Sequence, residues 1–312
     1  MRSKSIGLAN SFIPPIYQRW IQPSQAKSGV TVVELLVVVG LMSLLFAILL
    51  PAVQSVREAS RRSECTNRVR QLSLAMLNFE AGKQELPSGL TSKFPNPWMT
   101  WMAQILPFLD HQNEFNRSAS DYKLFPDPFV GHLMFQTPLR IFACPSDPNS
   151  GLVHETHFNR LVACTNYLGV TGINYEIKGG VLFLDSRIRL AEVRDGLSNT
   201  LLIGERPPSS DYWYGWWYSG LGQGGTGSAD SHLGVRELNL LPGKEETLTY
   251  LEDCPAGPYQ FQVGRGEQRD TLHFWSHHPN GATFSRCDGS VHFMAYGMND
   301  AMAALATRAD SE

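Results

Sequence analysis

The sequence predicts an α+β protein in which one long N-terminal helix, membrane-spanning in its first half, packs on an antiparallel β-sheet head with long loops. An apolar run crosses residues 30–53, and a helical spacing of apolar residues continues from it to residue 79 without Pro or Gly. Short apolar runs separated by turns fill the rest. A chain of 312 residues with 27 Gly, 19 Pro and 43% hydrophobic residues is neither collagen-like nor disordered.

The first element is a basic leader, residues 1–29. It holds four basic residues and no acidic residue, and therefore carries +4, which leaves −7 for the rest of a chain whose net charge is −3. This balance gives no electrostatic case for a nucleic-acid partner. A cleavable secretory signal has its small-residue site after the apolar core, whereas Lys27-Ser28-Gly29 comes before it. The apolar run is therefore expected to be a retained membrane helix.

That helix, residues 30–53, contains one charge, Glu34. At 1.5 Å per residue it would be about 36 Å long, enough to cross a hydrocarbon core of about 30 Å. Pro51 is expected to kink it, because proline removes a backbone hydrogen bond. A carboxylate inside a membrane is costly without a partner. Two roles remain open for Glu34: it lies at the interface among the headgroups, or it neutralises the α-amine that cleavage after Gly29 would create on Val30 of a neighbouring subunit.

The segment Gly29-Val30-Thr31-Val32-Val33-Glu34 resembles the processing site of type IV prepilins and pseudopilins. It has Gly before the scissile bond, Glu at the fifth mature position, an apolar run, and Pro51 at mature position 22. The resemblance implies a pilin-like fold, cleavage by a membrane prepilin peptidase, N-methylation of Val30, and packing against other pilin-like subunits through the helix. Val30 departs from the more common Phe or Met, and the leader is long.

The orientation of the head follows from the same resemblance. More basic residues follow the apolar run than closely precede it, so the positive-inside rule alone would place the head in the cytoplasm. The resemblance implies the reverse, and a basic stretch that continues a packed helix is not a free loop. We therefore expect a single-pass inner-membrane protein with an extracytoplasmic head, or a location at the cell surface or in a filament.

The expected organisation continues with an amphipathic extension of the helix over 54–82, an α+β head over 83–300 and a C-terminal tail over 301–312. In the head, residues 98–116 have helical spacing broken by Pro107, residues 179–184 and 200–204 are expected to be buried strands, and residues 206–258 are expected to be an insertion or long loops. Asp288-Gly289 between two apolar runs predicts a hairpin, and a two-residue turn there would pair Phe284 with Phe293.

Several head segments extend the resemblance. They are the residues 57–65, the stretch ILPFLDHQNEFN, Cys144-Pro145-Ser-Asp147, Thr165-Asn-Tyr167, Asp195-Gly196-Leu-Ser-Asn-Thr, and His278 followed after nine residues by Asp288-Gly289. Together they resemble the planctomycete-type prepilin-like proteins known as domain of unknown function 1559, or SBP_bac_10. This resemblance implies a class and a location rather than a reaction.

Cysteine and histidine offer few candidate sites. The five cysteines, at positions 65, 144, 164, 254 and 287, include no CxxC pair, and both Cys144–Cys164 and Cys254–Cys287 remain open as disulfides. Without paired cysteine spacing a structural zinc site is not expected, and a calcium loop is not expected because no stretch supplies several closely spaced oxygen ligands. His278 is expected to hold the turn before the hairpin through backbone hydrogen bonds. No catalytic or dinucleotide motif stands in its required context, so we expect no enzyme and no cofactor.

Two classes of function remain. The first is a pseudopilin-like structural subunit of a type II secretion or type IV pilus-like system. The alternative is a membrane-anchored extracytoplasmic protein that binds a glycan or solute. Its ligand platform would come from residues 211–218, which hold six aromatic residues. We expect alternate members to be buried, and the candidates for exposure are Tyr212, Trp213, Trp216 and Trp217.

Overall fold

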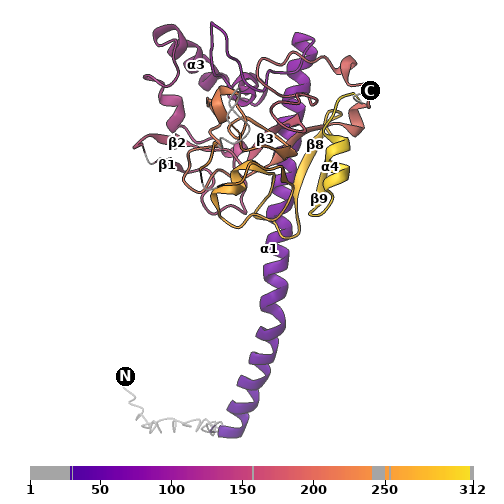
Figure 1. Ribbon diagram of the computed structural model, residues 1–312. Helices are drawn as coiled ribbons and strands as arrows, with labels where there is room; N and C mark the ends of the chain where they lie inside the picture. The colour runs from indigo at the N-terminus through magenta and orange to yellow at the C-terminus, as the bar shows by residue number, and fades with distance from the viewer. Residues whose placement is uncertain (1–28, 30, 157, 241–249, 253, 310–312) are drawn as a thin grey trace, which may run out of the picture. The chain divides into compact units, whose positions relative to one another are not determined.

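The computed structural model describes residues 29, 31–156, 158–240, 250–252 and 254–309 (Figure 1). The predicted leader, apart from Gly29, and the predicted first mature residue Val30 lie outside these residues. The chain divides into two compact units, Met1–Ala52 and Val53–Glu312. The boundary falls after Ala52, one residue beyond Pro51, inside helix α1 (Val32–Lys83).

In the first unit, α1 begins with a capping box that sequence reasoning missed. Glu34 Oε2 accepts hydrogen bonds from the Thr31 N–H at 2.8 Å and from the Thr31 hydroxyl at 2.9 Å. The Glu34 N–H donates in return to Thr31 Oγ1 at 3.3 Å, so the two residues satisfy each other's backbone donors. The large apolar side chains that follow, up to Leu50, are exposed, and the helix is long and apolar enough to cross a membrane.

In the second unit, α1 carries a buried stripe and ends at Lys83, where Gln84 takes a left-handed φ of 61°. The stripe repeats every three or four residues and consists of Cys65, Val69, Leu72, Ser73, Ala75 and Met76. The other helices are α2 (Trp101–Gln104), α3 (Gln112–Leu124) and α4 (Asn299–Leu305). The region of residues 98–116 is thus two helices, separated where Pro107 opens a short 3₁₀ turn.

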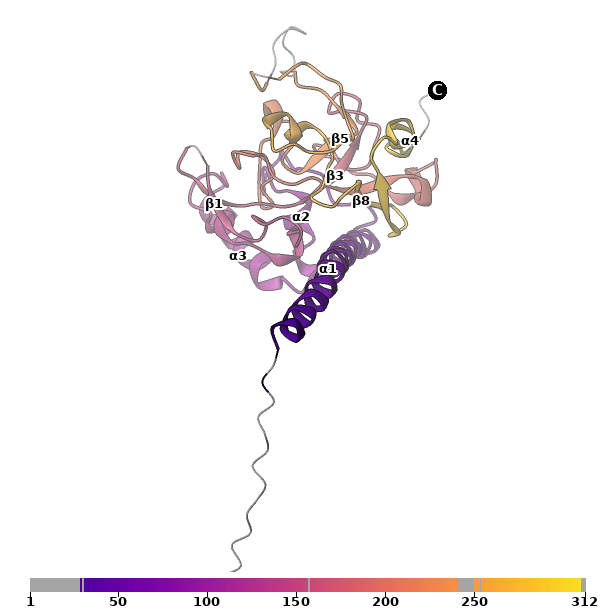
Figure 2. The same ribbon diagram turned by 90° about the horizontal axis from the view of Figure 1, so that it is seen from below.

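The main sheet has five strands, three of which are labelled in Figure 2. Their spatial order is β5 (His232–Gly234), β3 (Tyr167–Gly172), β4 (Leu201–Glu205), β8 (Gly281–Arg286) and β9 (Val291–Ala295). All pairs are antiparallel except β3–β5, which is parallel. Two small antiparallel pairs accompany it, β1 (Val153–Glu155) with β2 (Leu161–Ala163) and β6 (Arg236–Glu237) with β7 (Tyr259–Gln260). The predicted α+β class, a long helix with a sheet-containing head and long loops, is confirmed; the head sheet is mixed.

The β8–β9 hairpin forms as expected, but in a different register. Phe284 pairs with His292, and Phe293 pairs with Thr283. The turn is one residue longer than predicted, because Arg286 and Ser290 face each other across Cys287, Asp288 and Gly289. Gly289 has a φ of 81°, the left-handed conformation that a three-residue hairpin requires. The one-residue difference moves Phe293 off the face of Phe284.

Two other head segments differ from the prediction. Residues 179–184 form no strand; they lie beside β3, held by hydrogen bonds from the Gly180 and Leu182 N–H groups to Thr171 and Val170. The expected tail after residue 300 instead contributes to α4, where Met302 is buried. In both places the conformation depends on contacts with other parts of the head, which the local pattern of apolar residues does not specify.

Candidate functional site

A disulfide joins α1 to the loop after Phe142 and forms the centre of the candidate site. Cys65 is the first buried residue of the α1 stripe, and Cys144 lies 79 residues further along, with its Cα atom 5.6 Å from that of Cys65. The pairing differs from both disulfides that the sequence left open, Cys144–Cys164 and Cys254–Cys287, since Cys164 and Cys287 carry free thiols. Neither of the two pairs considered from the sequence included Cys65.

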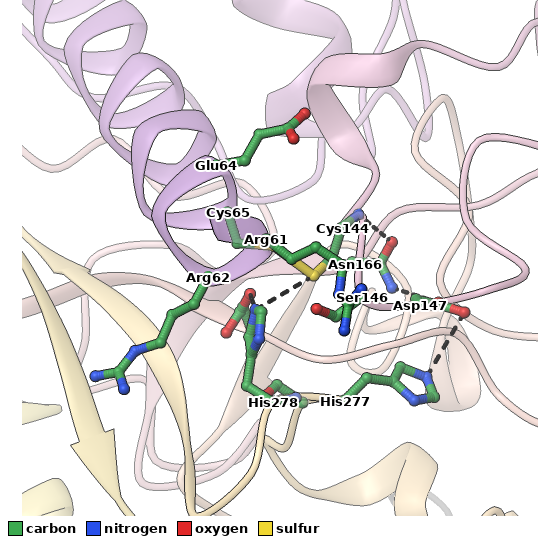
Figure 3. Close-up of a disulfide and its surroundings, with 12 residues drawn as sticks. Arg61, Arg62, Glu64, Cys65, Cys144, Ser146, Asp147, Asn166, His277 and His278 are labelled. Carbon is green, nitrogen blue, oxygen red and sulfur yellow. Dashed lines mark hydrogen bonds and ion pairs between the residues drawn. A yellow bond between two sulfur atoms is a disulfide. The ribbon is translucent and has the colours of Figure 1, made fainter. Parts of the chain in front are cut away.

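His278 reaches this disulfide from the loop before β8 (Figure 3). Its Nε2 lies 3.5 Å from Cys144 Sγ and 3.5 Å from Glu205 Oε1, at the end of β4. Its Nδ1 lies 2.6 Å from Glu58 Oε1, on α1. The imidazole therefore contacts side chains of three distant segments. This corrects the expectation that it holds its own turn through backbone hydrogen bonds, a role that the Ser276 hydroxyl performs by accepting the His278 N–H.

The charges of the site favour a protonated imidazole beside the disulfide. Burial opposes the charge, but attraction by the carboxylates of Glu205 and Glu58 outweighs it and raises the pKa of His278. Burial also disfavours ionised Glu58, yet the hydrogen bonds with His278 and Arg61 lower the pKa of Glu58. The result is a buried imidazolium held between two carboxylates, an arrangement in which each group depends on the others.

A polar chain supports the Cys144 side of the site (Figure 3). The Cys144 N–H donates to Asn166 Oδ1 at 2.8 Å, and Asn166 Nδ2 donates to Asp147 Oδ2 at 2.6 Å. Asp147 Oδ1 lies 3.6 Å from His277 Nε2. Because these groups are largely buried and hydrogen-bonded, the loop carrying Cys144 is held in one conformation.

The residues of the family motif fall into two groups in the structure. Cys144, Asp147 and His278 belong to the disulfide site, and Pro145 lies beside Cys144 in the same loop. The two Asp-Gly turns meet each other instead: the Asp288 N–H donates to the carbonyl of Leu197, directly after Asp195-Gly196. Gly196 and Gly289 both have positive φ, so these residues shape turns.

The expected aromatic platform is mostly core. Tyr214, Trp216, Trp217 and Tyr218 are buried, which differs from the expected alternation, and only Tyr212 and Trp213 are half-exposed. The Trp217 ring stacks on Phe142 and its indole N–H donates to the Thr137 carbonyl. A pocket of about 220 Å³ is lined on one side by Tyr212 and on another by Trp275 and His277.

Sequence reasoning missed Glu58 and Glu205. Glu58 lies in the motif segment 57–65, where it was interpreted as part of a charged helix surface. Glu205 follows a short apolar run without a recognised motif. The signal that could have found Glu205 is a carboxylate at the end of a fully apolar strand, a position that burial makes costly without a partner.

Comparison with known proteins shows the family of this chain. A family model described as "Protein of unknown function (DUF1559)", SBP_bac_10, matches residues 54–301. The chain belongs to this family. The DUF1559 match includes every residue of the disulfide site and begins after the predicted membrane segment. No curated protein and no solved structure matches the chain significantly.

This DUF1559 site can do two things chemically. The disulfide closes a long loop between α1 and the head, which constrains the unfolded chain. The histidine, the carboxylates and the sulfur atoms also form a compact set of donor groups, with ligand atoms of Cys65, Cys144, Glu205 and His278 all within 4.8 Å of one another.

Proposed function

We propose that this DUF1559 protein is a pseudopilin-like structural subunit of a type II secretion or type IV pilus-like system, processed after Gly29 and anchored by its N-terminal helix. One observation supports it most: α1 begins at Val32, just after the proposed cleavage point, and continues without a break from an exposed apolar part to a part with a buried stripe. An anchor hinged to a separate head would not need one uninterrupted helix.

The decisive measurement is the mature amino terminus. Mass spectrometry of the chain isolated from membranes should find N-methylated Val30. Gly29→Val should leave residues 1–29 attached, because a branched side chain would replace the small residue before the scissile bond. Gly40→Ala, a glycine substitution inside α1 with open space around it, is the matched control and should be processed normally. An intact Met1 on the membrane-bound wild-type protein would refute the proposal.

The capping box of α1 allows the role of Glu34 to be tested separately. Glu34→Gln keeps an oxygen that can accept the Thr31 N–H but removes the charge, whereas Glu34→Ala removes both. If Glu34 neutralises the amine of Val30 in a neighbouring subunit, both variants should lose subunit–subunit crosslinks in the membrane. Loss in Glu34→Ala alone would show that only the helix cap matters.

The alternative function, a membrane-anchored extracytoplasmic protein that binds a glycan or solute, would use the pocket that Tyr212 and Trp275 line. The pocket beside Tyr212 and Trp275 has a volume of about 220 Å³, which is below the usual range of about 300–1,000 Å³ for small-molecule sites. A change in tryptophan emission on addition of a glycan panel, lost in Tyr212→Ala, would favour this function. Unchanged emission would leave the structural role.

A further inference from the structure

The four donor groups at the disulfide have the spacing of a tetrahedral metal site. With Zn–S near 2.3 Å and Zn–N or Zn–O near 2.1 Å, ligand atoms in a tetrahedron stand about 3.6 Å apart for sulfur and nitrogen and about 3.4 Å for nitrogen and oxygen. The Cys144 Sγ–His278 Nε2 and His278 Nε2–Glu205 Oε1 separations are both 3.5 Å. Two edges of the tetrahedron are therefore already present.

Glu205 supplies the second, independent indication. The residue is 1% exposed, and its Oε2 accepts the Thr283 N–H at 2.6 Å. Its other oxygen, Oε1, accepts no hydrogen bond among the described residues, forms an ion pair with His278 Nε2 at 3.5 Å, and belongs to the cluster of Cys65, Cys144 and His278. A buried carboxylate is costly without a positive charge beside it, and a metal ion would supply that charge once His278 gives up its Nε2 proton.

The outer contacts of the cluster are those of a metal-binding histidine. A histidine that ligates through Nε2 donates its Nδ1–H to a carboxylate or carbonyl, which fixes the tautomer and the orientation of the ring. Here that acceptor is Glu58 Oε1, 2.6 Å from His278 Nδ1, and Arg61 and Ser146 hold Glu58 in turn. The imidazole is thus oriented from α1 with its Nε2 beside Cys144 Sγ.

We propose that the reduced chain binds one Zn²⁺ ion through Cys65, Cys144, His278 and Glu205, so that the disulfide and the metal are alternative crosslinks at one place. Two thiolates, an imidazole and a carboxylate suit zinc rather than calcium or magnesium, and four protein ligands leave no open position for a substrate. The site would be structural. Sequence spacing could not predict this site, because its ligands come from four separate segments.

The two states interconvert through balanced steps. A phosphine reduces the disulfide to two thiols by two electrons, and becomes a phosphine oxide with oxygen taken from water. Zn²⁺ then replaces the two thiol protons and the Nε2 proton of His278, which pass to solvent. The sulfur atoms separate to about 3.8 Å, a tetrahedral edge, by rotation of the two side chains. A disulfide oxidant reverses the exchange: it takes two electrons from the thiolates and releases the metal.

The test uses the full chain in detergent, which is reduced with a phosphine under anaerobic conditions and then freed of metal with a chelator. Titration with Co²⁺, a spectroscopic probe for zinc sites, should give the visible bands of a tetrahedral thiolate complex, saturating at one ion per chain, and one equivalent of Zn²⁺ should remove them. The oxidised chain should show no such bands. Addition of oxidised glutathione to the zinc form should release the ion to a chromogenic chelator.

Variants then assign the ligands. Glu205→Gln should weaken cobalt binding at least tenfold, and Glu58→Gln, which touches only the histidine, should weaken it by about 10- to 100-fold. Cys287→Ser is the control, because Cys287 is a buried thiol outside the cluster, and its bands should be unchanged. The proposal fails if the reduced wild-type chain gives no thiolate–cobalt bands, if Cys65→Ser retains them, or if Cys287→Ser loses them.

Discussion

Removal of the Cys65–Cys144 bond should cost far more than the loss of two buried sulfur atoms. The bond joins residues separated by 79 positions, and in the chain-entropy model closing a loop of that length stabilises the folded state by about 4.5 kcal/mol. Each buried sulfur contributes about 1 kcal/mol. Cys65→Ala or Cys144→Ala alone should therefore lower the free energy of unfolding by about 5.5 kcal/mol. The double variant should lower it by only about 6.5 kcal/mol, because either single variant already breaks the disulfide and the second substitution removes only one more buried sulfur.

The assay is guanidinium unfolding of the full chain in detergent, followed by the near-ultraviolet circular dichroism of the head tryptophans, in chelator and without reductant. In thermal unfolding, a loss of 4.5 kcal/mol would appear as a fall in Tm of about 10–20 °C for a domain of this size. Cys287→Ala, which removes a buried thiol outside any disulfide, should cost about 1 kcal/mol. Single cysteine variants whose costs are each near 1 kcal/mol and simply add would show that the crosslink does not stabilise the head.

Two further predictions concern buried positions of the head. Gly204→Ala should destabilise it by about 2 kcal/mol or more, because a Cβ there would lie 2.6 Å from Phe284 Cδ1; Gly82→Ala, a position inside α1 with open space around it, should cost less and tests the difference by thermal melts. Burial lowers the pKa of His232 to about 3 and raises that of Asp230 to about 6. Below pH 6.5, the usual pKa of histidine, His232 takes up a proton only on unfolding, so it destabilises the fold by about 1.4 kcal/mol for each unit by which the pH falls. Asp230 is protonated more readily when folded, so between pH 6 and 4 it stabilises the fold by a similar amount for each unit by which the pH falls. Denaturation at several pH values should show His232→Asn gaining stability relative to wild type as pH falls through this range, and Asp230→Asn losing it; parallel curves for all three proteins would contradict both assignments.

Local features of the sequence were good guides to single elements. The apolar stripe of α1 was predictable because its residues repeat every three or four positions, and β8 and β9 because an Asp-Gly turn separates two apolar runs. The register of that hairpin was not predictable. A two-residue and a three-residue turn both place Gly at the end, and only the pairing of Arg286 with Ser290 decides between them.

The aromatic segment shows the same limit. Six aromatic residues in eight could face solvent or core, and the sequence could not choose between a platform and burial. The choice depends on Phe142 and Thr137, which cover Trp217 from another part of the chain. Burial of this kind is a property of the surroundings, so it cannot be obtained from the segment alone.

The amino-acid order alone was enough for the long helix, its apolar first part and the family, because each depends on neighbouring residues at helical spacing or on short motifs. The candidate site required the folded chain. Glu58 and His278 are 220 positions apart yet hydrogen-bonded, and a structural zinc site was not expected because the cysteines lack paired spacing. Ligand spacing along a chain detects sites built within one loop; α1, β4 and two loops build this one, and only their packing brings two sulfur atoms, an imidazole and a buried carboxylate within 4.8 Å.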